Sequence, residues 1–120
     1  MKPELQKRLV KFSASIIGLE KYLQACFASK HLNKQVIRSS SSAALNYGEA
    51  QTAETRKDFI HKLGIVVKEL KETEVNLEII LESKIFRQDS FIIAPLKECK
   101  ELIAIFMATI KTAKKNNGSG

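Results

Sequence analysis

The sequence has little of what interrupts a helix and no segment that could span a membrane. Its 120 residues contain two prolines, five glycines and no tryptophan. One proline is Pro3, and two of the glycines lie in the final segment, 116–120. Long stretches are therefore free of helix breakers, which favours helices. The longest mainly apolar run, Leu102–Ile110, has nine residues, whereas a membrane helix needs about eighteen. We expect no membrane segment.

Cysteine and histidine are also scarce. The two cysteines, Cys26 and Cys99, lack metal-ligand spacing and are typical of buried thiols in a reducing compartment. The N-terminus has no continuous apolar stretch of the kind a signal peptide needs. We therefore predict a cytoplasmic protein. A carboxylate three residues before a histidine, as in di-iron bundles, occurs once, at Asp58 and His61, so we predict no metal site.

Catalytic motifs are missing as well. The serines of Ser39–Ser42 belong to no Gly-x-Ser-x-Gly elbow, and there is no glycine-rich phosphate loop. We expect no catalytic residues, no cofactor and no enzymatic activity.

Three segments repeat apolar residues every three or four positions, as helices with one buried face do. The first contains Leu5, Leu9, Phe12, Ile16, Leu19 and Leu23, with Val10, Ile17 and Phe27 widening the stripe. The third begins within residues 52–57 and contains Phe59, Leu63, Val66, Leu70, Thr73, Leu77 and Ile80. The fourth contains Ile92, Leu96, Cys99, Ile103, Phe106, Ile110 and Ala113.

A second helix is expected at about 34–53, after a break at 31–34 with Asn33 as its N-cap. A turn fits 83–89. Pro95 requires that the fourth helix either starts near Ala94 or has a kinked first turn. Short connections make neighbours antiparallel. The predicted fold is all-α: an up-down antiparallel four-helix bundle over residues 1–115, with a disordered tail at 116–120.

Apolar residues outside these seams predict a subunit interface. They are Leu102, Ile105 and Met107, together with Ile85, Phe86, Phe91 and Ile93.

Positive charge gathers toward both ends of the chain. The net charge is +7. Residues 1–38 carry eight Lys or Arg and two Glu, whereas residues 39–85 carry six basic and eight acidic residues. This asymmetry indicates either a polyanion-binding surface or charge complementarity between subunits. The candidate nucleic-acid contacts are Lys7, Arg8, Lys11, Lys21, Lys34, Arg38, Lys111, Lys114 and Lys115. The alternative is a purely structural or protein-interaction module whose charge only aids assembly.

One segment carries a family resemblance. It has Arg38-Ser39, Ser42, Asn46, Glu49-Ala50, then Asp58-Phe59 and Lys62-Leu63, then Lys68-Glu69 and Glu72-Thr73. This pattern resembles the 23S rRNA intervening-sequence protein family, also labelled "four helix bundle protein" or S23 ribosomal protein. The resemblance implies an up-down bundle that assembles into rings, typically pentamers, with a basic surface and no enzymatic activity. It also implies RNA or DNA, or a nucleic-acid enzyme that the bundle would scaffold, as partners.

The motif itself has two interpretations. At 100° per residue, Arg38, Ser42 and Glu49 share one side of a helix, with Asn46 a little further round. We expect a polar network that fixes helix register, in which Arg38 pairs with Glu49, Glu69 or Glu72. A direct nucleic-acid role for Arg38 is the alternative. The residues assigned to the structural motif are Arg38, Ser42, Asn46, Glu49, Asp58, Phe59, Glu69 and Glu72.

Overall fold

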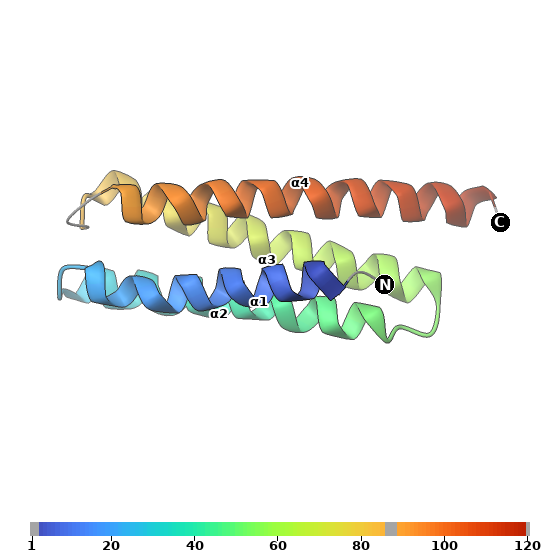
Figure 1. The fold of residues 1–120 in the computed structure, drawn as a ribbon, viewed down its shortest axis with the longest axis horizontal. Coiled ribbons are helices and arrows are strands. Elements are labelled where there is room, and N and C mark those ends of the chain that lie inside the picture. Colours follow the sequence, from blue (N-terminus) through green and yellow to red (C-terminus); the bar gives the residue numbers. More distant parts are fainter. Residues whose placement is uncertain (1–2, 86–88, 120) are drawn as a thin grey trace.

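The computed structural model describes residues 3–85 and 89–119. Four α-helices follow one another in an up-down arrangement that measures 52 × 22 × 19 Å. They are α1 (Pro3–Ile17), α2 (Phe27–Gln51), α3 (Arg56–Ser83) and α4 (Ser90–Ser119), and a 3₁₀ helix, η1 (Gly18–Tyr22), follows α1. The N-terminus, the α2–α3 connection and the C-terminus lie at one end of the bundle, and η1 lies at the other (Figure 1). The predicted antiparallel four-helix bundle is confirmed.

The break between the first two helices lies earlier than the predicted 31–34. The first α-helix ends at Ile17 and tightens into η1, and α2 already begins at Phe27. Its N-cap is Cys26, whose Sγ accepts from the backbone N–H of Ser29 at 3.4 Å while Ser29 Oγ accepts from the Cys26 N–H at 3.2 Å. This reciprocal box satisfies the first amides of the helix. Asn33 is therefore not a cap, but a buried residue within α2.

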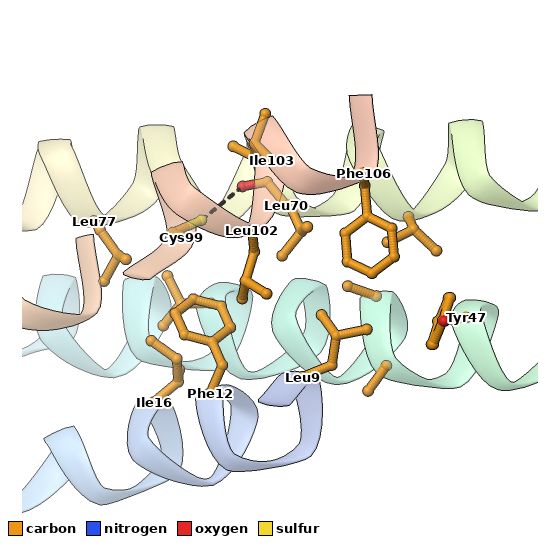
Figure 2. Close-up of a cluster of buried hydrophobic side chains, with 14 of the residues drawn as sticks. Leu9, Phe12, Ile16, Tyr47, Leu70, Leu77, Cys99, Leu102, Ile103 and Phe106 are labelled. Carbon is orange, nitrogen blue, oxygen red and sulfur yellow. Dashed lines mark hydrogen bonds between the residues drawn. The ribbon is translucent and has the colours of Figure 1, made fainter. Parts of the chain in front are cut away.

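The predicted seams of α1, α3 and α4 form the core. Leu9, Ile16, Leu70 and Phe106 are among the side chains with at most 1% exposure, and Figure 2 shows them meeting between the four helices. The seam positions at the ends of the bundle, such as Leu5, are half-buried. Helix α2, by contrast, contributes small side chains to the core. Its Ala43, Ser39 and Ser40 are all fully buried, which allows α2 to approach its neighbours closely.

The expected widening of the first seam is wrong. Val10, Ile17 and Phe27 are 53%, 54% and 86% exposed. Val10 and Ile17 lie on the flank of α1, away from the core seam, and Phe27 belongs to α2 because the first helix ends ten residues before it.

Among the apolar residues outside the seams, burial varies. Leu102 is fully buried, whereas Ile93 and Met107 are about half exposed, at 52% and 50%. Ile85, Phe91 and Ile105 are half-buried, and Phe86 lies outside the described residues. Part of the predicted surplus thus belongs to the core of a single chain, and the rest faces outward.

The fourth helix is longer than the sequence indicated. It begins at Ser90, so a helical turn precedes Pro95, and the missing N–H of Pro95 leaves the carbonyl of Phe91 without its usual helical donor. The helix extends to Ser119 and includes residues 116–119 of the segment expected to be disordered; Gly120 lies outside the described residues. Within the described ranges, no helix is both long and apolar enough to cross a membrane.

Candidate nucleic-acid interface

The family-like segment of α2 forms a polar seam against α3. Ser39 Oγ lies 2.6 Å from Thr73 Oγ1, and both residues are fully buried. Because each polar atom of a buried seam needs a partner, this bond between the helices favours one register of α2 on α3. The side-chain amide of Asn46 donates to the carbonyl and to the hydroxyl of Ser42, one turn earlier on the same helix.

Arg38 links α2 to α3 nearer the surface than the Ser39–Thr73 bond does. Its Nη1 donates to Glu69 at 3.0 Å and its Nη2 donates to Glu72 at 2.7 Å. The Arg38 side chain is 59% exposed, whereas that of Glu69 is only 10% exposed. Burial by itself would raise the pKa of Glu69, but hydrogen bonds from Ser42 and Arg38, together with the guanidinium charge, lower this pKa overall. The predicted register network is therefore present at Arg38.

The remaining motif residues have separate contacts. Glu49 accepts a hydrogen bond from Lys62 at 2.7 Å, so of the three carboxylates offered as alternative partners of Arg38 it is the one that pairs elsewhere. Asp58 lies in the first turn of α3, where its backbone N–H donates to the Thr55 cap. Phe59 is half-buried and packs against the core. Each of these contacts stabilises the α2–α3 pair or the start of α3.

Arg8 is the second predicted nucleic-acid contact that is occupied within the chain. Its Nε and Nη2 donate to the two carboxylate oxygens of Glu98 at 2.7 and 2.8 Å, and Nη2 also donates to Glu101 at 2.8 Å. These contacts, the hydrogen bond to Glu98 foremost, raise the pKa of Arg8. Arg8 thus links α1 to α4, and a phosphate would have to compete with two carboxylates for it.

The lysines behave differently from the two arginines. Seven carboxylates of the described residues form ion pairs with five basic side chains, which include Arg8 and Arg38. The predicted lysines are exposed and, within residues 3–85 and 89–119, have no carboxylate within ion-pair distance. They are Lys7, Lys11, Lys21, Lys34, Lys111, Lys114 and Lys115. The excess positive charge is therefore presented to solvent.

The predicted lysines do not form one surface. Lys21 lies in η1, at the end of the bundle opposite the C-terminal turns of α4, which carry Lys111, Lys114 and Lys115 (Figure 1). Lys7 and Lys11 lie one turn apart on α1. Among the predicted lysines, Lys34 lies on the exposed first turns of α2. The sequence analysis did not predict these turns as a binding surface.

This surface is the outward side of the first turns of α2, which we call the α2 basic–aromatic face. It comprises Phe27, Lys30, His31 and Lys34, spaced three or four residues apart and all exposed. The ring of Phe27 is 86% exposed and stacks on His31, with centroids 6.2 Å apart and an interplanar angle of 6°. An exposed aromatic ring flanked by lysines is the arrangement on which proteins stack single-stranded bases. The sequence prediction missed it because residues 31–34 were assigned to a break.

A hollow of about 440 Å³ adjoins this face, between η1 and α2. Lys30 and Lys34 line it together with Glu20, which carries the single carboxylate of its lining. Asn33 also lines the hollow; it is 6% exposed, and its Oδ1 is buried without a hydrogen-bond partner in the described part of the chain. The site thus has two cations against one anion.

The search for a metal site gives a negative result for the described residues. In the part of the chain that the structure describes, no group of three or more His, Cys, Asp or Glu side chains lies close enough to hold a metal ion. Cys99, a core residue, donates its thiol to the carbonyl of Leu70 at 3.2 Å.

The fold and these contacts define a small up-down four-helix bundle with a polar register seam and a lysine-rich exterior. The chain belongs to the 23S rRNA-intervening sequence protein family, and the match to that family covers residues 2–108. It is also similar to a crystal structure of a protein with unknown function from the S23 ribosomal protein family of Bacteroides thetaiotaomicron. The TM-score is 0.79 at 30% identity, covering 89% of this chain and 98% of the other. No curated protein matches the chain.

Proposed function

We propose that the protein is a cytoplasmic, non-enzymatic, homo-oligomeric bundle that binds single-stranded RNA or DNA through the α2 basic–aromatic face. The observation that carries this proposal is the exposed stack of Phe27 on His31, with Lys30 and Lys34 exposed within two turns of it on the same helix. Apolar rings of this size are normally covered, and an exposure of 86% leaves the Phe27 face free for a base.

The charges of this face support the same conclusion. Lys30 and Lys34 form no ion pair within the described residues, so each can neutralise one phosphate and release its counterion. Arg38 contributes less, because Glu69 and Glu72 already hold its guanidinium. Affinity would thus combine a salt-dependent part from the lysines and a salt-independent part from stacking.

Fluorescence anisotropy with a labelled single-stranded oligonucleotide tests the proposal. We expect log K to fall linearly with log salt, and the slope to shrink by about 1.4 in Lys30→Gln/Lys34→Gln, since each of the two phosphate contacts contributes about 0.7. Phe27→Ala should weaken binding about tenfold at every salt concentration, as the loss of one base stack does. Leu45→Ala is the matched control, because Leu45 is 69% exposed on the same helix, and it should change nothing.

Two results would reject the nucleic-acid proposal. One is the absence of binding at about 50 mM salt, where electrostatic binding is strong. The other is equal weakening by Phe27→Ala and Leu45→Ala. The first result would support the rival interpretation, a structural or protein-interaction module, and the second would show that binding does not use the α2 basic–aromatic face.

The oligomer rests on a different observation. Among the described residues, and apart from Phe27 and Leu45, six large hydrophobic side chains are at least 46% exposed, including Ile17, Ile93 and Met107. Such residues on several helices favour self-association, and the family resemblance favours a pentamer. Light scattering should give a mass near five times 13.5 kDa; a monomer at micromolar concentration would contradict this part of the proposal.

A further inference from the structure

A second cavity lies at the opposite end of the bundle from the α2 basic–aromatic face. It has a volume of about 730 Å³ and is bounded by the start of α1, the α2–α3 connection and the middle of α4. Its walls are largely apolar, with contributions from Leu5, Ala50, Phe59 and Ile105. Cavities of this size and composition with a few polar groups are typical of small-molecule sites.

Tyr47 forms the inner side of this cavity. It is 4% exposed, and its ring packs edge-on against Phe106 with centroids 5.1 Å apart, at the margin of the buried cluster (Figure 2). Its hydroxyl makes no hydrogen bond to any described residue. Although the ring is buried, the hydroxyl oxygen is not sealed in the core, and Tyr47 lines the cavity. The hydroxyl is therefore available to a polar group that enters the cavity.

The charges around the cavity select the kind of ligand. Glu4 and Glu54 line it, and neither forms an ion pair within the described residues. Arg56 is the single basic side chain of the lining. Burial raises the pKa of Tyr47, and the charge of Glu4 adds to that rise. Glu4 and Tyr47 line the same cavity, and the two carboxylates of its lining favour a cation.

We propose that this cavity binds a small aromatic amine. The ring lies between the apolar walls contributed by Phe59 and Ile105, and the ammonium group donates hydrogen bonds to the Glu4 carboxylate and to the Tyr47 hydroxyl oxygen. Phe59 and Tyr47 also offer aromatic faces, which attract a cation in an apolar setting. The site is independent of the nucleic-acid proposal, because it shares none of the α2 basic–aromatic face.

Three probes that differ in charge test the inference on the full chain. Phenethylamine, 2-phenylethanol and 3-phenylpropionate carry the same ring with a positive, neutral or negative end group. Each is titrated into ¹⁵N-labelled protein, and amide shifts of the cavity-lining residues are followed. We expect saturable shifts with phenethylamine, with Kd on the order of 1 mM or tighter, and at least about tenfold weaker binding of 3-phenylpropionate.

Variants then locate the ammonium. Glu4→Gln should lower the affinity for phenethylamine about tenfold, as the loss of a charged hydrogen bond does. The affinity for 2-phenylethanol should not change. Glu82→Gln is the matched control: it removes the same charge from an exposed position at the far end of α3 and should have no effect. Tyr47→Phe should also lower the affinity for phenethylamine. If this core variant does not fold, the comparison of Glu4→Gln with Glu82→Gln still tests the proposed site.

Three outcomes would overturn the inference. They are the absence of saturable shifts with the amine, equal affinity for the amine and the carboxylate, and equal behaviour of Glu4→Gln and Glu82→Gln.

Discussion

The hydroxyl of Ser39 lies 2.6 Å from that of Thr73, and both side chains are completely buried between α2 and α3. Thr73 also donates to the carbonyl of Glu69 at 2.9 Å. Ser39 has a more distant backbone acceptor, the carbonyl of Val36 at 3.4 Å, so the shorter Thr73 contact favours Ser39 as the donor between the two helices, although either hydroxyl can donate. This short hydrogen bond forms only when Ser39 and Thr73 lie opposite each other, so it favours a single register of α2 against α3.

Removing one partner of this hydrogen bond should lower the free energy of unfolding more than removing both partners. Thr73→Val keeps the shape but leaves the Ser39 hydroxyl without its partner, so we expect a loss of about 1–3 kcal/mol in the free energy of unfolding. Adding Ser39→Ala should recover part of that loss, giving a positive coupling between the two sites. Urea denaturation measures both. Thr112→Val, at an exposed position on α4, is the control; strictly additive losses would contradict a direct bond.

Arg38 should stabilise the protein in a pH-dependent way. The pKa of Glu69 is lowered from its ordinary 4.5 in the folded chain, with Arg38 among the causes. A carboxyl whose pKa is lower when folded contributes stability above its unfolded pKa, and loses that contribution as the pH falls through the folded value. Arg38→Ala should therefore destabilise at pH 7, by about 1 kcal/mol for this half-exposed pair.

The difference between wild type and Arg38→Ala should shrink as the pH falls below 4.5. Urea unfolding at several pH values measures it. Lys62→Ala serves as a comparison, because its partner Glu49 is 58% exposed and its pair should matter less. Unchanged stability together with lost oligonucleotide binding would instead assign Arg38 to nucleic acid.

The seams of α1, α3 and α4 could be predicted because buried positions recur at the helical period, so Leu9, Leu70 and Phe106 each identify their own face. The start of α2 could not. Its cap is Cys26, a residue rarely used for capping, and the chain before it tightens into η1 where the apolar spacing continues through Leu19 and Leu23. The same spacing extends to Phe27, which made an exposed ring look like a core position.

The ion-pair partners of individual charged residues also could not be predicted from the sequence. Arg8 and Lys7 are adjacent and equally basic, yet Arg8 faces Glu98 across the α1–α4 boundary and Lys7 faces solvent. That difference depends on which helix lies beside α1, and no local pattern contains it. Arg38 was predicted better, because the motif placed it on the same helix face as other polar residues.

Asn33 offers a stabilising substitution. Its side chain is 6% exposed, and within the described residues Oδ1 has no hydrogen-bond partner. A buried acceptor without a partner costs about 1–3 kcal/mol. Asn33→Leu, which has a similar volume, should therefore raise the free energy of unfolding by about 1 kcal/mol in urea denaturation. Gln35→Leu, on the exposed side of α2, is the control. A loss of stability in Asn33→Leu would show that the amide is needed where it is.

The two thiols should differ sharply in reactivity. Cys26 is exposed at the N-cap of α2, where hydrogen bonds from Ser29 lower its pKa, whereas burial raises the pKa of Cys99 to about 12. Thiolate is the reactive form, so at pH 7.5 iodoacetamide should modify one thiol per native chain and two in urea. Mass spectrometry counts the adducts. Cys26→Ser should abolish the native reaction, and rapid native labelling of Cys99 would mean that the core opens between α3 and α4.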